Sequence, residues 1–403
     1  MTSVILGASL GIAADALVIL TFTSMLYYIL VVVASLAVSR GRQLRGTRPR
    51  ASVLVPLCGI HQSLRANLEA FRATLGPGDE LLIGATRPDD PAIALARKVF
   101  EYDERVRIVA GSSSDATNPK VATLVALERL ATHDIIVLVD SDVRLDIALL
   151  DGLVSPLADP RTGLATALYR GVPSGSFASH LEALWINMDF VPSVLVSHLL
   201  SGGIDFALGA ANAVRREVLT AIGGIATLGE VLADDHVLGK RVSQAGYRVT
   251  IASVCVPIWL DSSLNETLAR LLRWCRTYRA CQPVGYAATL ISHHGVACAA
   301  LALGLAALGV GSVRPAAILL AGVLVVRMSS GLVAHRVLAG RDADIRDLPL
   351  LGVRDLVGSA LFVAAWSGRG VTWRGARYRV APDGTLHRRA PGPTGAARRP
   401  VAP

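Results

Sequence analysis

The placement of the apolar residues constrains this 403-residue chain more than any other feature. Residues 16–38 form a run of 23 positions without a charge, and a bilayer-spanning helix needs about 20 apolar residues. No Lys or Arg precedes this run, which disfavours a cleaved signal peptide. A second apolar block covers 287–338 and is divided near 311–315. The sequence therefore predicts an N-terminal transmembrane anchor with a basic flank, residues 1–50, and a C-terminal membrane region, 287–366, that begins with a helical hairpin.

The last apolar stretch, 348–366, differs from the others because Arg354 and Asp355 interrupt it. Charged side chains are costly within the hydrocarbon layer, so we expect a re-entrant or interfacial segment here rather than a full span. Five arginines follow the first apolar run, between 40 and 50, and the tail 367–403 is also basic. The positive-inside rule places both in the cytoplasm, together with the region 51–286 between them.

The middle region, 51–286, reads as an α/β domain. Short runs rich in β-branched residues alternate with segments of helical apolar spacing. The expected strands are 51–56, 80–85, 106–110 and 133–140, and the expected helices are 64–75, 91–102 and 119–131. This order predicts a mostly parallel sheet covered by helices, with ligands bound beyond the carboxyl ends of the strands.

Composition excludes several classes of protein. Hydrophobic residues make up 52% of the chain and charged residues 18%, which is too apolar for a disordered chain or an ordinary soluble enzyme. The net charge is +9, but aromatic residues are only 5%, so we expect no nucleic-acid partner. The five cysteines are scattered, which argues against a disulfide framework or a structural zinc site.

An acidic pair, Asp140 and Asp142, follows the most apolar predicted strand. Two carboxylates at a strand end can hold a hard divalent cation, with a phosphate completing its ligand shell. The chain contains a second D-x-D at 342–344, but that one lies in a basic linker after the hairpin. We therefore predict a metal and nucleotide role for the first pair only.

Two predicted helices open with a capping residue followed by proline. Asp90 precedes Pro91 and Asn118 precedes Pro119, so each can be an ordinary helix cap. Lys120 then lies in the first turn of its helix, where the helix dipole disfavours a cation. Its position suggests an anion nearby, such as a phosphate.

A second acidic pair, Asp234 and Asp235, precedes another helix and could cap it or supply a carboxylate base. Further on, a capping box opens a helix near 263–280 with an apolar stripe and arginines at every third position. A basic amphipathic helix lying on an anionic membrane surface would explain most of that pattern.

Taken in order, these motifs resemble those of ceramide glucosyltransferases, which have a GT-A fold and a D, D, D, (Q/R)-x-x-R-W signature. The matching segments are DDPAI at 89–93, NPK at 118–120, DSD at 140–142, ADD at 233–235 and RLLRW at 270–274. The segment 270–283 and the closing WRG at 373–375 resemble the bacterial branch, which includes enzymes of hopanoid biosynthesis. The chain departs from the family at 190–192, where ceramide enzymes have a histidine before proline, and this departure weakens ceramide as the implied acceptor.

The resemblance implies a role for each motif. Asp90 would lie near the uridine, and Asp140 and Asp142 would meet the diphosphate and Mg²⁺ or Mn²⁺. Asp235 would be the catalytic base. Three residues would lie near the diphosphate and the acceptor: Arg270, Arg273 and Trp274.

The implied reaction is inverting transfer of glucose or N-acetylglucosamine from a UDP-sugar to a lipid hydroxyl, of ceramide or of a hopanoid polyol, at the bacterial inner membrane. A processive polysaccharide synthase shares the signature but would need more spans to form a channel. A polyprenyl-phosphate glycosyltransferase shares the sheet but would not explain the R-x-x-R-W helix. A membrane scaffold with a decayed transferase domain is disfavoured because the acidic residues of the signature are all present.

Overall fold

The structure is a computed structural model that describes residues 2–38, 48–112, 114–339, 346–373 and 376–388. Four of the predicted features lie outside these ranges: the basic flank before residue 48, the D-x-D at 342–344, residues 374–375 and the tail after 388.

Within the described chain, one sheet contains seven strands in the order β3-β2-β1-β4-β6-β5-β7. Strands β1 to β4 are parallel neighbours, as predicted, while β6 runs antiparallel to both β4 and β5. The last strand, β7, is parallel to β5. The bounds are β1 Ala51–Leu57, β2 Glu80–Ala85, β3 Val106–Ala110, β4 Ile135–Val139, β5 Thr162–Pro173, β6 Ala211–Arg215 and β7 Arg248–Leu260.

Helices cover both faces of this sheet, which explains why its central strands are apolar throughout rather than alternating. All residues of β1 and β4 are buried. One face packs against α2, α3 and α5, and the other against α4, α8 and α9. These helices are α2 Leu64–Thr74, α3 Pro91–Val99, α4 Pro119–Glu128, α5 Ile147–Val154, α8 Arg216–Ala221 and α9 Asp234–Gln244.

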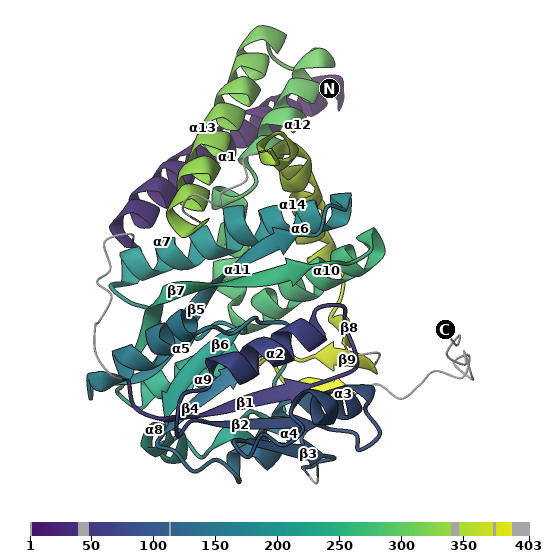
Figure 1. Cartoon of the computed structure of the whole chain (residues 1–403). Coiled ribbons are helices and arrows are strands. Elements are labelled where there is room, and N and C mark those ends of the chain that lie inside the picture. Colours follow the sequence, from purple (N-terminus) through teal and green to yellow (C-terminus); the bar gives the residue numbers. More distant parts are fainter. Residues whose placement is uncertain (1, 39–47, 113, 340–345, 374–375, 389–403) are drawn as a thin grey trace, which may run out of the picture.

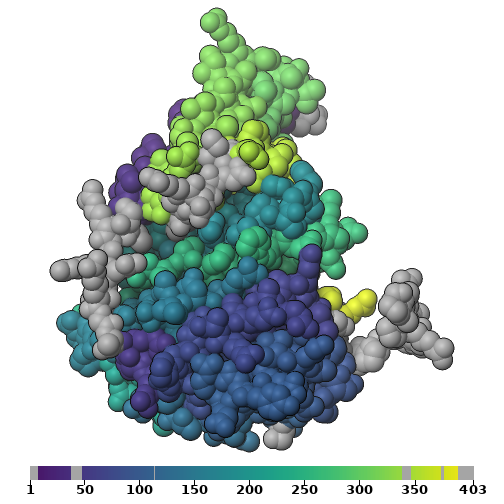
Figure 2. Space-filling view, in the orientation of Figure 1, coloured from purple at the N-terminus to yellow at the C-terminus, as the bar shows by residue number. Residues whose placement is uncertain are grey.

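Apolar helices form a bundle at one end of the molecule (Figure 1). It contains α1 (Thr2–Val38), α12 (Gly295–Ala307) and α13 (Val313–Ala339), which pack on one another. The predicted first arm of the hairpin is not one straight helix, because α11 (Pro283–Ser292) meets α12 at 53° across His293 and His294. Figure 2 shows the α12–α13 tip protruding from the body of the protein.

Four helical segments of the described chain are long and apolar enough to cross a membrane, or five if the bent α11–α12 pair counts as one. One of them lies within the region that the sequence placed in the cytosolic domain. It comprises α6 (Phe177–Trp185), a π-helical turn (Ile186–Phe190) and α7 (Val191–Ser201). Buried positions make up 61% of this segment, against 22% for α1, and it packs between the sheet and the bundle (Figure 1). It is therefore the junction between the two parts of the molecule.

A buried charge network explains the two charges that interrupt the last apolar stretch. Arg327 of α13 places its Nη2 2.7 Å from Asp189 of the π-helical turn and its Nε 3.0 Å from Asp355 of α14 (Leu351–Trp366). Arg354 contacts the same two carboxylates and lies over the ring of Trp185. Two arginines and two aspartates thus neutralise one another, which offsets part of the cost of burying them.

Both ends of α14 contact the half of the molecule that carries the large sheet. His180 of α6 lies 2.7 Å from Asp347, just before the helix, and Gly368, just after it, accepts a hydrogen bond from Arg279. The interfacial or re-entrant placement of this segment, expected from the sequence, stays a prediction.

The described part of the basic tail forms a small antiparallel sheet that the sequence did not predict. Its strands are β8 (Gly370–Trp373), β9 (Ala376–Val380) and β10 (Leu386–Arg388). Leu386 N–H donates to Glu230 O over 2.7 Å, and Leu232 packs in the core of this sheet. The C-terminal sheet thereby holds the segment that leads into α9.

Candidate active site

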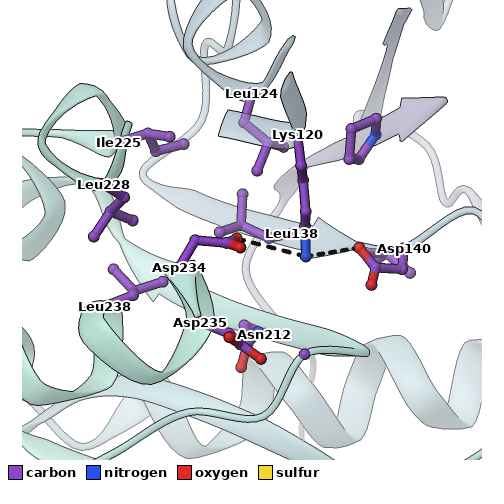
Figure 3. A pocket seen from close by; sticks show the side chains of 13 residues that line it. Lys120, Leu124, Leu138, Asp140, Asn212, Ile225, Leu228, Asp234, Asp235 and Leu238 are labelled. Atoms are coloured by element: carbon purple, nitrogen blue, oxygen red, sulfur yellow. Dashed lines mark ion pairs between the residues drawn. The ribbon is translucent and has the colours of Figure 1, made fainter. Parts of the chain in front are cut away.

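Charged side chains from three elements converge at the carboxyl end of β4 (Figure 3). Lys120 of α4 lies between two carboxylates, with its Nζ 2.8 Å from Asp140 and 3.6 Å from Asp234. Asp235 lines the same pocket. The cavity among these side chains is only about 10 Å³, so the charges are packed closely together. The sequence predicted that ligands bind beyond the carboxyl ends of the strands. In the structure these four side chains lie together at that end of β4.

The loop that carries Asp140 and Asp142 is fixed by its own backbone. Asp140 N–H donates to Ala210 O over 3.0 Å, and Val143 N–H donates to Asp140 O over 3.1 Å. Asn67 of α2 donates to Ser141 O over 3.0 Å. These backbone hydrogen bonds and the contact from Asn67 therefore keep both residues at the strand end.

Asn118 connects the two helices that flank the pocket. Its side chain accepts hydrogen bonds from Lys120 N–H and Val121 N–H, which confirms the predicted cap of α4. The same amide donates to Val231 O over 2.9 Å and to Asp234 over 3.3 Å. Residue 118 thus fixes the start of α4 relative to the start of α9.

Lys120 is held as a cation in this pocket. Burial alone would lower its pKa, but Asp140, Asp234 and Asp235 together raise that pKa above its ordinary value. The sequence suggested that an anion lies beside Lys120. In the structure the carboxylates of Asp140 and Asp234 lie beside it.

Asp235 has the environment of a proton acceptor. Burial, followed by the charge of Asp234, raises its pKa to about 6. The space for its carboxylate depends on Gly209, because a Cβ at that position would lie 2.8 Å from Asp235 Oδ2. Asp234, in contrast, is engaged with Lys120 and Asn118. A buried carboxylate of raised pKa suits a general base.

The donor set at Asp140 and Asp142 fits a divalent cation. Asp142 Oδ1 is buried and has no hydrogen-bond partner among the described residues. Burial, then the charge of Asp140, raises the pKa of Asp142 to about 6, so a cation there would relieve an unfavourable charge. No cluster of three or more potential protein ligands occurs in the described ranges. Two carboxylates would therefore hold such an ion, and its other ligands would come from a phosphate group or water.

The arginine-rich helix is α10, Leu264–Cys281, and its capping box is formed as predicted. Arg270 Nε lies 3.0 Å from Glu182 of α6, whose carboxylate is 1% exposed, and Arg270 also contacts Ser262. The positive charge of Arg270 lowers the pKa of Asp142, while burial raises it. Arg270 of α10 therefore interacts electrostatically with the end of β4. Trp274 packs in the apolar cluster between the large sheet and the α6–α7 segment.

Four of the predicted site residues lie outside the set that lines the Lys120 pocket: Asp142, Arg270, Arg273 and Trp274. Asp90 is also absent from that lining and acts as the cap of α3, since its carboxylate accepts from Ala92 N–H over 3.0 Å and from Gly59 N–H over 2.9 Å. The ordinary explanation of Asp90 as a cap is confirmed. Its predicted place near a uridine stays a prediction.

Sequence reasoning missed Gly209, Asn212 and Glu182. Gly209 and Asn212 line the pocket from the segment before β6 and from β6 itself, a strand that the sequence analysis did not identify. Glu182 lies in an apolar helix, where a single acid gives no pattern. The one available signal was that a lone carboxylate in such a helix needs a cationic partner.

The α/β fold and the acidic strand end define a class, the GT-A glycosyltransferases. A solved structure with a similar fold is the mannosyltransferase PcManGT from Pyrobaculum calidifontis, in complex with GDP-Man and Mn²⁺. It matches with a TM-score of 0.56 and 20% identity, over 89% of this chain and 98% of that one.

The chain belongs to glycosyltransferase family 21, because the profile described as "Glycosyl transferase family 21" matches residues 16–386. Curated relatives are ceramide glucosyltransferases 3 and 1 of Caenorhabditis elegans, 25% identical over 242 residues and 24% identical over 244 residues. These matches cover 58% and 59% of this chain, and 52% and 51% of the relatives. The match thus spans about half the length of each relative. The predicted resemblance to the ceramide glucosyltransferase family is confirmed.

Proposed function

We propose that this glycosyltransferase is an inverting enzyme that transfers glucose or N-acetylglucosamine from a UDP-sugar to the hydroxyl of a membrane lipid, a ceramide or a hopanoid polyol. Membership of family 21 and the similarity to two ceramide glucosyltransferases support a lipid acceptor. The apolar helices support a place in the membrane, which we propose is the bacterial inner membrane, with the sheet domain in the cytoplasm.

The observation that carries the proposal is the placement of Asp235 in one pocket with Lys120 and Asp140. Asp235 accepts the proton of the acceptor hydroxyl while the hydroxyl oxygen attacks the anomeric carbon. The bond between that carbon and the diphosphate oxygen breaks on the opposite face, and UDP leaves with the bonding electrons. The configuration of the sugar is therefore inverted.

Positive charge is the second requirement, because negative charge develops on the diphosphate as it leaves. Lys120 lies beside Asp140 and is held as a cation. Arg270 and Arg273 supply further charge from α10, and Glu182 fixes the orientation of Arg270. A divalent cation held by Asp140 and Asp142 would, when bound, neutralise part of the same diphosphate charge.

The test is mass spectrometry of lipids from a host that expresses the chain, with and without hopanoids and with and without sphingolipids. The expected result is a new glycolipid that depends on one of these lipid classes and is lost in Asp235→Asn. Purified protein should then convert a UDP-sugar and that lipid to the same product with inverted configuration. A product of retained configuration, or transfer that persists in Asp235→Asn, would overturn the proposal.

A further inference from the structure

A second pocket lies where α14 ends and the C-terminal sheet begins. Its volume is about 410 Å³, and it shares no residue with the Lys120 pocket. Three of its lining residues are arginines from separate segments: Arg279 at the end of α10, Arg369 before β8 and Arg379 in β9. The remaining lining residues are small or aromatic: Trp366, Ser367, Gly368 and Gly370.

The fold brings these like charges together and holds them there. Arg279 Nη2 donates to Gly368 O over 2.7 Å, and its guanidinium lies 5.5 Å from the centre of the Trp366 ring. Arg379 is the cross-strand partner of Gly370, beside Arg369. No acidic side chain is among the residues that line the pocket. Burial, followed by the charge of Arg369, lowers the pKa of Arg279, so the cluster lacks a balancing negative charge.

The location of the pocket indicates which kind of anion would bind there. Trp366 is the last residue of a helix that is apolar enough for a membrane, and the pocket begins at that residue. Tryptophan is enriched at the level of the lipid head groups. Arg369 follows Trp366 by three residues, and Arg279 and Arg379 line the same pocket. A Trp366 ring at the head-group level would therefore place all three arginines where lipid phosphates are concentrated.

We propose that this pocket binds the phosphate group of an anionic membrane lipid. Guanidinium groups match phosphate oxygens in a bidentate geometry, and basic pockets beside membrane helices on the cytoplasmic side bind acidic head groups. A bound lipid would connect α10 to α14 and the C-terminal sheet, the sheet that also holds the segment before Asp234. The proposal concerns lipid binding alone and stands whether or not the acceptor and donor proposed above are correct.

The test uses the full chain purified in a neutral detergent, with native mass spectrometry to count bound lipid. Phosphatidylglycerol and phosphatidylcholine are titrated separately, without donor or acceptor. The variant Arg279→Gln/Arg369→Gln/Arg379→Gln should bind phosphatidylglycerol at least about tenfold more weakly than the wild type, because each arginine near an anionic lipid contributes appreciably to the attraction. Binding of phosphatidylcholine should be weak in both.

A matched control removes three exposed positive charges elsewhere, with Arg97→Gln/Lys98→Gln/Arg129→Gln at the ends of α3 and α4. This control should bind phosphatidylglycerol as the wild type does; an equal loss would mean a general charge effect and overturn the site. A titration with inorganic phosphate distinguishes a lipid phosphate from a free phosphate. If inorganic phosphate stabilises the protein as much as phosphatidylglycerol does, the proposal that the ligand is a lipid is overturned. If the triple variant does not fold, Arg369→Gln and Arg379→Gln, both at exposed positions, are compared singly, and unchanged binding in both would overturn the proposal.

Discussion

Lys120 supplies positive charge to a pocket that also holds the carboxylates of Asp140, Asp234 and Asp235. The two aspartates of the second pair differ in their contacts. Asp234 accepts from Asn118 and lies near Lys120, whereas Asp235 has the raised pKa and the space left by Gly209. The structure thus separates a positioning carboxylate from a candidate base.

We expect Asp235→Asn to abolish transfer while UDP-sugar binding is largely retained. An amide cannot accept the hydroxyl proton, and loss of a general base costs roughly 10²–10⁴-fold in rate. Asp234→Asn should be milder. Two quantities are measured for each variant: the turnover rate, and the affinity for the UDP-sugar donor by calorimetry. A larger loss of turnover in Asp234→Asn would reverse the assignment within the pair.

A second prediction concerns Gly209. We expect Gly209→Ala to lower kcat by at least about tenfold, because the new Cβ would lie 2.8 Å from Asp235 Oδ2 and must displace that carboxylate. Thermal stability should hardly change, since the end of a side chain can move. Gly203→Ala is the control, because a Cβ at 203 meets nothing within 4 Å. Wild-type turnover in Gly209→Ala would show that the carboxylate position is not critical.

Among the elements, α10 combines two functions that its sequence alone could not separate. Arg270 is bound to the buried Glu182, while Arg276 and Arg279 donate to backbone carbonyls at the start of the C-terminal sheet. One end of the helix therefore contacts α6, and the other contacts the start of the C-terminal sheet.

We expect Arg273→Lys, and less strongly Arg270→Lys, to lose activity with membrane association unchanged. A planar guanidinium can contact a diphosphate in a bidentate manner, and an ammonium cannot. Trp274→Ala should also inactivate the enzyme. Arg276→Lys is the control and should stay near the wild type. Turnover in detergent micelles is the readout, and equal tolerance of lysine at all three arginines would leave α10 as a membrane-surface helix only.

The charge network between α13, α14 and the π-helical turn gives a prediction on stability. Arg327→Met leaves Asp189 and Asp355 with one cationic partner, Arg354, in a buried place. Breaking a buried ion pair from one side typically costs about 3–5 kcal/mol. We expect a clear fall in the thermal midpoint in detergent, partly restored by adding Asp355→Leu. An unchanged midpoint in Arg327→Met would contradict the role given to this network.

In the protein as a whole, the sheet domain and the apolar helical bundle pack together through α6, the π-helical turn and α7. This junction contacts α10, the helix that carries Arg270 and Arg273. A lipid acceptor that stays in the bilayer fits such an arrangement.

We expect the sheet domain and the C-terminal sheet to be cytoplasmic, since the basic residues after α1 and in the tail set the orientation. Protease added to inside-out vesicles should digest the domain, and sealed right-side-out vesicles should protect it. Protection in the inside-out vesicles would overturn this topology.

Features that depend on a local pattern of residues could be predicted from the amino-acid sequence. Apolar length indicated the membrane helices, and β-branched runs placed β1 to β4 within about two residues, because buried parallel strands have a distinctive composition. Short-range capping chemistry likewise gave Asp90, Asn118 and the capping box of α10. The ordered acidic motifs pointed to the family.

Contacts between residues that are distant in the sequence could not be predicted, because they form only when the elements pack. Nothing local relates Lys120 to Asp234, Glu182 to Arg270, or Arg327 to Asp189, since each pair is joined only when separate elements pack. The antiparallel β6 and the C-terminal sheet also escaped prediction, because short strands of mixed polarity give weak patterns. Arg354 and Asp355 interrupt an apolar stretch of the sequence, where charged side chains are costly to bury. In the structure they form ion pairs with Asp189 and Arg327 of other helical segments, because ion pairing depends on distance in space rather than along the chain.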